Sequence, residues 1–355
     1  MNDVINYAIV GLGRAGWSIH AEALKDRSDT RIVAVVDPSA PRREEAAATF
    51  QCRTYRTLPP LLRNEPSVDV IVVATPSRRH GSDTKLALKA GKHVVVEKPM
   101  AMSVAEADGM MRCAAACGRK LFVHQNYRFF PAYRHFRRVI DSGRLGRLFH
   151  IRFCSTQFAR RNDWQTLQTN GGGVLNNTGP HPLDYLIQLA GAPIEKVMGD
   201  LQQVASLGDV EDHVKALMRA ANGCTIDLEI SSAQNIARDQ ARWVLSGTCG
   251  TLTSDEQTSV LRWFDPAKVA SLEVVDGPAP DRIYGNDDRL PWQEETIDVA
   301  AETSSGRCSF YDNVAATLRR GEAMIVTPES AREVIRLIAE IRKGTAFPGK
   351  KPRRG

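Results

Sequence analysis

The sequence lacks a hydrophobic run of about 18 residues, the length that a membrane-spanning helix needs. No basic segment precedes an apolar stretch near its beginning, so we expect no secretory signal. Its seven cysteines do not have the spacing of a zinc site or of a disulfide framework. These absences predict a cytoplasmic protein that has reduced thiols, no metal and no contact with a membrane.

The chain also lacks a broad excess of basic residues. It has 47 Lys and Arg against 41 Asp and Glu, which gives a net charge of +6 at pH 7. Four of the positive charges lie in GKKPRRG at 349–355, within a segment, 347–355, that we expect to be a solvated basic tail. Aromatic residues make up only 6% of the chain and are not interleaved with basic ones, so we expect no nucleic-acid partner.

What the sequence does have is a glycine-rich turn between an apolar run and the start of a helix. Gly11, Gly13 and Gly16 fit the pattern G-x-G-x-x-G. In such turns the first glycine permits the tight bend, the second lets the backbone approach a pyrophosphate, and the third lets helix and strand pack closely. The free N–H groups at the helix start attract phosphate oxygens. The pattern predicts a dinucleotide site here, with Arg14 and Ala15 beside the glycines.

A second apolar run, residues 31–36, ends in Asp37, about 20 residues after the glycines. A carboxylate at this position accepts hydrogen bonds from the adenosine ribose hydroxyls and repels a 2′-phosphate, so it favours NAD over NADP. Arg42 and Arg43 lie nearby and could serve NADP, but we expect Asp37 to dominate. The alternative is that the glycines form an ordinary turn and that Asp37 only ends a strand.

Short apolar runs and helical segments alternate over the first third of the chain. Residues 68–74, 93–96 and 120–124 read as strands buried on both faces, which is typical of a parallel sheet. We therefore predict that residues 1–124 form a doubly wound Rossmann domain, whose ligands bind at the carboxyl ends of the strands. The polar residues at those ends are the candidates for a site: Asp37, Thr75, Glu97, Lys98, Gln125 and Asn126.

From residue 125 onward the pattern changes to alternating segments typical of a largely antiparallel sheet with one covered face. We predict a second α/β domain over 125–346, built on a large open sheet. Proline, glycine and polar residues concentrate over 278–296, which we interpret as a long loop or lid. At 355 residues the chain is long enough for two domains, each with its own core.

Several further motifs follow one another along the chain. They are Ala74-Thr75-Pro76 with His80, Glu97-Lys98-Pro99, Gln125 to Phe129, and the stretch from Gly171-Gly172-Gly173 through Gly179 and His181 to Asp184. Together with the glycine turn and Asp37 they resemble the glucose–fructose oxidoreductase, inositol dehydrogenase and rhizopine-catabolism (Gfo/Idh/MocA) family. The resemblance implies a dinucleotide domain and then a mainly antiparallel sheet that commonly builds homodimers or homotetramers. Family members mostly oxidise or reduce a secondary alcohol or ketone on a sugar, cyclitol or related polyol.

The resemblance also implies roles for individual residues. Those that would line the cofactor are Thr75, Pro76, His80, Glu97 and Gln125. Lys98 would contact both the cofactor ribose and the substrate hydroxyl, next to a cis peptide bond before Pro99. His181 would be the general base, because an imidazole with an ordinary pKa near 6.5 exchanges a proton around neutral pH. The alternatives are, for Lys98, a surface lysine that caps a strand and, for His181, a histidine that caps a helix or lies in the core.

Position 177 departs from the family pattern, in which an aspartate commonly stands two residues before the glycine of this motif. Here the residue is Asn177. Asparagine cannot take a proton, but it can hold a substrate hydroxyl by donor and acceptor together. We therefore expect proton transfer to fall on His181 with Lys98, without a neighbouring carboxylate to raise the pKa of His181.

Three other residues are candidates for substrate recognition: Asn126, Arg128 and Trp164. Arg128 follows the last strand of the first domain and either pairs with a substrate carboxylate or anchors the seam between the domains. Trp164 either stacks on a sugar face or is buried in its loop. Asp184 is expected to support the fold or to orient His181.

The sequence therefore predicts an NAD-dependent oxidoreductase that transfers a hydride between nicotinamide and a secondary alcohol or ketone of a sugar, cyclitol or related polyol. Two other functions stay open. One is a glycoside hydrolase that keeps NAD bound and oxidises its substrate transiently. The other is a non-catalytic NAD-binding regulator, against which the presence of Lys98 and His181 argues.

Overall fold

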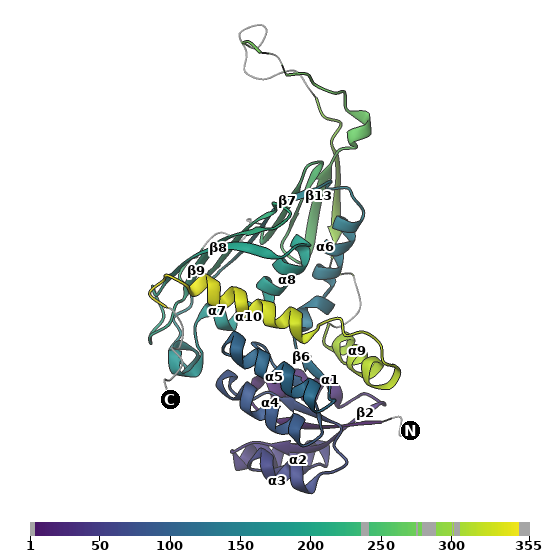
Figure 1. The fold of residues 1–355 in the computed structure, drawn as a ribbon, viewed down its shortest axis with the longest axis vertical. Helices are drawn as coiled ribbons and strands as arrows, with labels where there is room; N and C mark the ends of the chain where they lie inside the picture. The colour runs from purple at the N-terminus through teal and green to yellow at the C-terminus, as the bar shows by residue number, and fades with distance from the viewer. Residues whose placement is uncertain are drawn as a thin grey trace.

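The computed structural model describes residues 4–235, 241–274, 276–278, 289–299, 301 and 306–347. Two sheets with their helices form two layers of the molecule, the first in the lower part of Figure 1 and the second above it. Nearly all of the predicted basic tail lies outside the described residues. Among the residues described, no helix combines the length and the apolar character that crossing a bilayer requires.

The first sheet has six parallel strands in the order β3-β2-β1-β4-β5-β6, which is the order of dinucleotide-binding folds. Its central strands are buried on both faces, as their unbroken apolar sequences predict. The strands are β1 Ile5–Val10, β2 Thr30–Val36, β3 Arg53–Tyr55, β4 Val70–Val73, β5 His93–Val96 and β6 Leu121–Val123. The helical segments between them are η1 Gly16–Ala21, α1 Glu22–Leu24, α2 Ala40–Phe50, α3 Leu58–Asn64, η2 Ser77–Arg79, α4 His80–Lys89 and α5 Val104–Ala116.

The second sheet has eight strands in the order β14-β13-β12-β11-β7-β10-β9-β8. All neighbours pair antiparallel except β7 and β10, which are parallel. The strands are β7 Leu148–Thr156, β8 Ile194–Gln202, β9 His213–Ala220, β10 Thr225–Ser231, β11 Trp243–Gly247, β12 Gly250–Ser254, β13 Thr258–Trp263 and β14 Gln293–Asp298. One face packs on helices, and these are α6 Pro131–Asp141, α7 Val174–Asn177, α8 Pro180–Ala190 and α10 Pro328–Arg342. The predicted fold class is therefore confirmed.

The predicted loop over 278–296 is wrong at its end, because residues 293–298 form strand β14 and pair with β13. Residues 279–288 of that prediction lie outside the described part of the chain. The sequence Gln-Glu-Glu-Thr-Ile-Asp is polar on both faces, so its composition gave no sign of a strand. The pairing with β13 decides its structure.

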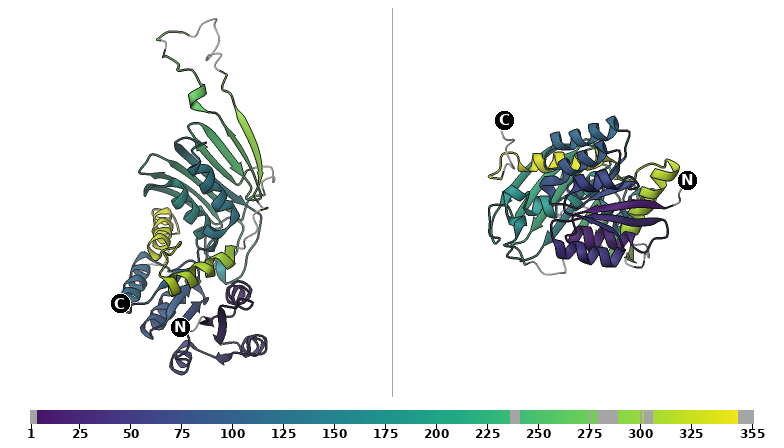
Figure 2. Two further views of the ribbon diagram at one scale, coloured as in Figure 1. Left: turned by 90° about the vertical axis from the view of Figure 1, so that its right-hand side faces the viewer. Right: turned by 90° about the horizontal axis from the view of Figure 1, so that it is seen from below.

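The last two helices connect the two cores. Helix α9, Gly306–Arg320, lies in the predicted second domain by sequence but packs against the first sheet, where Tyr311 is fully buried against Tyr7. Helix α10 gives Ile335 to the first core and Val334 and Leu337 to the second. Figure 2 shows this helix lying between the two layers. The packing fixes the first sheet relative to the second, and with it the site between them.

Candidate active site

The glycine turn follows β1 and leads into η1. Gly11 has a φ of +94°, and a Cβ atom there would lie 2.6 Å from the carbonyl oxygen of Ala74. A Cβ at Gly16 would lie 1.8 Å from the carbonyl oxygen of Gly11, so neither position tolerates a side chain. A Cβ at Gly13 would meet nothing within 4 Å. The backbone at Gly13 is therefore open to a ligand, as a pyrophosphate cradle must be.

Asp37 ends β2 with a carboxylate that the backbone fixes. Its Oδ2 accepts a hydrogen bond of 2.8 Å from the N–H of Leu12, and its Oδ1 accepts one of 2.9 Å from Ser39. Because a carboxylate can accept about four hydrogen bonds, ribose hydroxyls can still bind. Arg42 lies 3.7 Å from Oδ2, and Arg43 donates to the carbonyl oxygen of Asp37 at 2.7 Å. The edge of the site thus carries both the predicted acid and two arginines next to it.

His80 connects the segments that follow β4 and β5. Its Nδ1 lies 2.8 Å from the carbonyl oxygen of Pro99, and its Nε2 lies 2.8 Å from that of Thr75. The hydroxyl of Thr75 donates to Asp83 at 3.0 Å, and Pro76 beside it is exposed. Both ring nitrogens of His80 therefore contact protein carbonyls. The ring thus holds two segments of the site together, and its contact with the cofactor stays a prediction.

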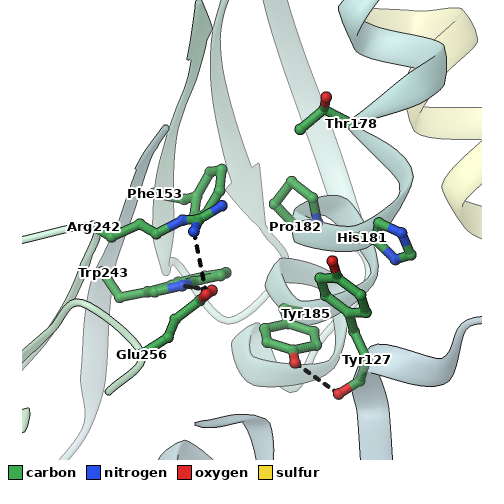
Figure 3. Close-up of a pocket in the computed structure, with 9 residues that line it drawn as sticks. All are labelled: Tyr127, Phe153, Thr178, His181, Pro182, Tyr185, Arg242, Trp243 and Glu256. Carbon is green, nitrogen blue, oxygen red and sulfur yellow. Dashed lines mark hydrogen bonds and ion pairs between the residues drawn. The ribbon is translucent and has the colours of Figure 1, made fainter. Parts of the chain in front are cut away.

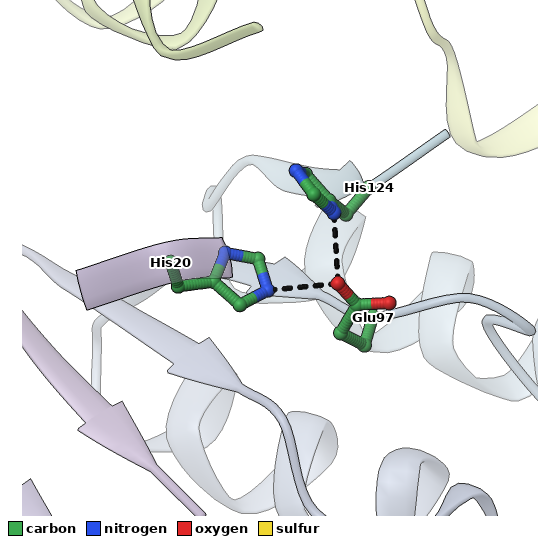
Figure 4. A group of neighbouring side chains, drawn as sticks. All are labelled: His20, Glu97 and His124. Atoms are coloured by element: carbon green, nitrogen blue, oxygen red, sulfur yellow. Dashed lines mark hydrogen bonds and ion pairs between the residues drawn. The ribbon is translucent and has the colours of Figure 1, made fainter. Parts of the chain in front are cut away.

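Glu97 ends β5 and turns its carboxylate into the protein, where it lies between two histidines (Figure 4). Its Oε1 lies 2.8 Å from Nδ1 of His124 and 3.0 Å from Nε2 of His20, and its Oε2 accepts the backbone N–H of Lys98 at 3.0 Å. Nδ1 of His20 contacts the hydroxyl of Tyr311 at 2.7 Å. Burial alone would raise the pKa of Glu97, but the two imidazoles hold it well below its usual value.

Sequence reasoning placed Glu97 against the cofactor and did not find its two histidine partners. The three donor atoms lie within 4.8 Å of one another, a spacing that also suits metal ligands. Nδ1 of His124 is hydrogen-bonded to Oε1 of Glu97 at 2.8 Å, and Nε2 of His20 lies 3.0 Å from the same oxygen. Burial and, as the second cause, the neighbouring His124 lower the pKa of His20. Glu97 is therefore a buried carboxylate that two imidazoles hold in place behind Lys98.

Lys98 reaches across to the second domain. Its Nζ donates a hydrogen bond of 2.7 Å to the carbonyl oxygen of Asn177, which ends α7. The peptide between Lys98 and Pro99 is cis, as the resemblance implies. Burial lowers the pKa of Lys98, Glu97 opposes this shift, and the exposed Arg14 adds to it. An amine of this kind gives up its proton more readily than a surface lysine does.

His181 lies in the first turn of α8, four residues after Asn177. Its ring stacks on that of Tyr127 with centroids 3.8 Å apart and an interplanar angle of 10°. Burial and then the charge of Lys98 hold the pKa of His181 well below its usual value, so the ring is neutral around pH 7. A neutral imidazole beside an ammonium is a pair that can accept one proton and stabilise one developing oxyanion.

The glycines before α7 allow the helix to sit against the second sheet. A Cβ at Gly173 would lie 2.2 Å from the buried carboxylate of Glu211, and Gly173 has a φ of +99°. Glu211 pairs with Arg342 of α10 at 2.7 Å and accepts the N–H of Leu175 at 3.3 Å. The glycine motif thus fixes the short helix from which Asn177 presents its carbonyl to Lys98.

The segment after β6 ties the two domains together. Gln125 donates to the carbonyl oxygen of Pro180 at 3.3 Å, and Asn126 beside it is buried. Arg128 donates from Nε to Asp184 at 2.7 Å and from a terminal nitrogen to the carbonyl oxygen of Ile325 at 3.1 Å. Arg128 is therefore the anchor of the seam, and its predicted pairing with a substrate carboxylate is corrected because Asp184 already holds the guanidinium.

Trp164 lies on η4, Trp164–Thr166, in the loop after β7. Its side chain is 44% exposed, so the alternative of a tryptophan buried in its loop is wrong. Asp163 caps this turn by accepting the N–H of Gln165 at 2.9 Å. The exposed ring is accessible to a sugar face, and that contact stays a prediction.

A small cavity of about 50 Å³ adjoins His181 between α8 and the strands β7 and β11 (Figure 3). The residues that line it are Tyr127, Phe153, Thr178, His181, Pro182, Tyr185, Arg242, Trp243 and Glu256. Apart from His181, sequence reasoning found none of them as site residues. Arg242, Trp243 and Glu256 come from the far part of the second sheet, and no motif marks them. Only the pairing of β11 with β7 brings them to α8.

Two parts of the chain match known domain families. Residues 5–125 match an oxidoreductase family with an NAD-binding Rossmann fold, and residues 133–253 match the GFO/IDH/MocA C-terminal domain. Fold and site thus define an oxidoreductase that binds a nicotinamide dinucleotide. The chain belongs to the Gfo/Idh/MocA family.

Named relatives act on sugars and cyclitols. The scyllo-inositol 2-dehydrogenase (NADP(+)) IolW of Bacillus subtilis (strain 168) is 22% identical over 345 residues, which cover 95% of this chain and 92% of that protein. The D-glucoside 3-dehydrogenase of Escherichia coli (strain K12) is 28% identical over 255 residues, covering 67% and 72%. The WlbA dehydrogenase from Bordetella pertussis, solved with NADH and UDP-GlcNAcA, has the same fold with a TM-score of 0.78, 23% identity and 97% of each chain covered.

Proposed function

We propose that this protein is an NAD-dependent dehydrogenase of a secondary alcohol on a sugar, cyclitol or related polyol. The observation that carries the proposal is that Lys98 and His181, which come from different domains, are close enough to interact electrostatically. The carbonyl of Asn177 holds the amine, and burial and then the charge of Lys98 lower the pKa of His181. Oxidation of an alcohol removes a hydride from carbon and a proton from oxygen, so it needs an acceptor for each.

The residues present suit the dinucleotide. Gly13 leaves its backbone open for the pyrophosphate, and Asp37 offers a fixed carboxylate to the ribose. Nicotinamide, when bound, supplies the acceptor or donor of the hydride. Lys98 donates an N–H to the substrate oxygen and stabilises the charge that develops there as the O–H bond breaks. His181 takes the proton in oxidation and returns it in reduction, while Asn177 and Asn126 orient the polyol.

We infer NAD rather than NADP as the preferred cofactor. The carboxylate of Asp37 repels a 2′-phosphate, and its two backbone hydrogen bonds hold it at the ribose edge. Arg42 opposes this preference from 3.7 Å. The relatives include an NADP(+) enzyme and a protein solved with NADH, so the preference rests on Asp37.

The test is an absorbance assay for NADH across sugars, uronates, cyclitols and amino sugars, paired with thermal unfolding in NAD. Net NADH from a free polyol supports the proposal. Release of an aglycone without net NADH identifies instead a hydrolase that oxidises its substrate transiently. A rise in melting temperature with NAD but no turnover across the panel identifies a regulator and contradicts the proposal.

We further propose that the protein forms a homodimer or homotetramer through the uncovered face of the second sheet. Met198 of β8 and Leu217 of β9 lie opposite each other there, 68% and 51% exposed. Apolar side chains placed together on an open sheet favour a second copy as their cover. Light scattering of the wild type and of Leu217→Lys tests this, since a lower mass is expected for the variant.

For the location we propose the cytoplasm, where the six free thiols that the structure describes stay reduced.

A further inference from the structure

We propose that the cavity beside His181 is a subsite for an uncharged hydroxymethyl group of the substrate. The substrate is then a hexose rather than a cyclitol, a pentose or a uronate. This inference rests on the proposed function, because it names the substrate class of the same site. Since His181 lines the cavity, a group bound there lies next to the proposed base (Figure 3).

Two buried polar atoms at the cavity have no hydrogen-bond partner among the described residues: Nε of Arg242 and Nδ1 of His181. Folded proteins pair almost all buried polar groups, so such atoms at a cavity indicate a ligand. The Nε of arginine can only donate, so the ligand must bring an oxygen that accepts. The imidazole nitrogen can either donate to a hydroxyl or accept from it, which makes a hydroxyl the group that suits both.

The charges at the cavity compensate each other. Arg242 lies 3.2 Å from the carboxylate of Glu256, and it also donates to the hydroxyl of Ser155 at 3.3 Å. The second oxygen of Glu256 accepts the indole N–H of Trp243 at 2.8 Å. A substrate carboxylate would face Glu256, and an ammonium group would face Arg242. Because the charges of Arg242 and Glu256 already compensate each other, a charged substituent of either sign would meet a like charge, and this wall favours a neutral substituent.

The remaining walls are aromatic. The rings of Phe153 and Trp243 pack with centroids 4.5 Å apart, the ring of Tyr185 lies 5.5 Å from that of Trp243, and the guanidinium of Arg242 lies 5.4 Å from the centroid of Phe153. Such faces bury a methylene group well. A cavity of about 50 Å³ has room for one small substituent or a few waters. A hydroxymethyl group offers the methylene to the rings and the hydroxyl to Arg242.

The turn between β12 and β13 holds Glu256 in an unusual conformation. Its φ is +80°, a value that residues other than glycine rarely adopt. Ser254 accepts the N–H of Glu256 at 3.0 Å, and Asp255 accepts that of Gln257 at 2.9 Å, so the turn is fixed by its own side chains. Backbone strain is found most often where a side chain must be presented to a site. Here it brings the carboxylate to Arg242 and Trp243.

The first experiment compares sugars that differ only in the group at this position. We would measure kcat/KM with NAD for D-glucose, 6-deoxy-D-glucose, D-xylose and D-glucuronate, for D-galactose, D-fucose, L-arabinose and D-galacturonate, and for scyllo-inositol. In the series that is turned over, kcat/KM for the hydroxymethyl sugar should be about 10-fold or more above kcat/KM for the sugars that carry a methyl group, a hydrogen or a carboxylate there. This is the loss expected when a hydrogen bond to a charged donor is removed.

The outcomes separate the two proposals. Equal rates for the methyl and hydroxymethyl sugars, or for scyllo-inositol and the best hexose, would overturn the subsite and leave the dehydrogenase in place. No NADH from any of the nine compounds or from the wider panel above, together with stabilisation by NAD, would overturn both.

Variants test whether Arg242 carries the preference. In Arg242→Met, kcat/KM for the hydroxymethyl sugar divided by kcat/KM for the methyl sugar should fall to about one. A ratio as high as that of the wild type would contradict the proposal. The matched control is Arg262→Met, which should leave the ratio unchanged. Arg262 pairs with Glu294 at 3.0 Å and lies 5.8 Å from the ring centroid of Trp292, so it repeats the combination of carboxylate and aromatic ring at an exposed position of β13.

A second variant covers the case in which Arg242→Met does not fold. Glu256→Gln keeps an oxygen for the indole of Trp243 but leaves Arg242 without its counter-charge. The ratio of kcat/KM for D-glucuronate to kcat/KM for D-glucose, or for D-galacturonate to D-galactose, should then rise by about 10-fold. An unchanged ratio would overturn the subsite.

Discussion

The ammonium nitrogen of Lys98 donates a hydrogen bond of 2.7 Å to the backbone carbonyl oxygen of Asn177, and this contact joins the two domains at the site. A main-chain oxygen cannot ionise, so it fixes the amine without adding a charge. The side chain of residue 177 takes no part in this contact. It is an uncharged amide close to a lysine whose pKa is lowered by burial.

Replacing Lys98 by Met should reduce kcat by about 100-fold or more, because the variant loses the group that stabilises the developing oxyanion. Thermal unfolding should still show stabilisation by NAD, since the glycine turn and Asp37 are unchanged. Lys120→Met, at an exposed position before β6, serves as the control and should keep full activity. A Lys98→Met enzyme with wild-type kcat would remove Lys98 from the mechanism.

The pH dependence follows from the directions of two pKa shifts. His181 acts as a base only when neutral, so activity should fall as the pH drops through its low pKa. Lys98 acts only when charged, so activity should also fall as the pH rises through its pKa, which lies below the usual value for lysine. A rate profile of kcat/KM should therefore be flat at neutral pH and bounded on both sides.

Asn177→Asp tests this assignment. A carboxylate beside the amine and the imidazole would favour the charged form of each, so both limits of the profile should move to higher pH. Gln188→Glu adds the same charge near the far end of α8 and should leave both limits in place. Limits that do not move in Asn177→Asp would show that residue 177 is not coupled to the base.

Glu97→Gln should shift the alkaline limit to lower pH. The buried carboxylate raises the pKa of Lys98 against the effect of burial, and its loss would let the amine deprotonate earlier. Glu65→Gln is a matched control, because Glu65 is another buried glutamate of the first domain and is paired with Arg53. An alkaline limit that stays fixed while stability falls would reduce the role of Glu97 to packing.

Arg128→Met should lower the free energy of unfolding by about 3–5 kcal/mol, because Asp184 would keep a buried carboxyl group without its partner. The double variant Arg128→Met with Asp184→Leu should recover much of this loss. Denaturant unfolding of the three proteins measures the effect. A single variant as stable as the wild type would mean that the pair does not anchor the seam.

The cofactor preference of the wild type should be at least tenfold in favour of NAD in kcat/KM, which corresponds to about 1.4 kcal/mol. Asp37→Asn removes the negative charge, so the ratio should fall toward one, with Arg42 left to attract a 2′-phosphate. Asp26→Asn, at an exposed position after α1, is the control. Equal use of NADP by the wild type would contradict the preference.

The sequence by itself determined the parallel sheet and predicted that ligands bind at the carboxyl ends of its strands. It also predicted the motif residues Gly11, Gly13, Asp37 and Lys98. These features depend on local chemistry: a buried strand needs an unbroken apolar run, and a tight turn against a backbone needs glycine. The order of the motifs along the chain was enough to indicate the family. The prediction missed strand β14 because its residues are polar and show no apolar pattern.

Only the tertiary structure decided the partners of the buried charges. Arg128 pairs with Asp184, and Glu97 with His20 and His124, and no motif spacing links the members of these groups. Their contacts follow from which strands become neighbours and which helices lie between the two sheets. Burial then makes each pairing obligatory, since a charge removed from water must find its counter-charge within the fold.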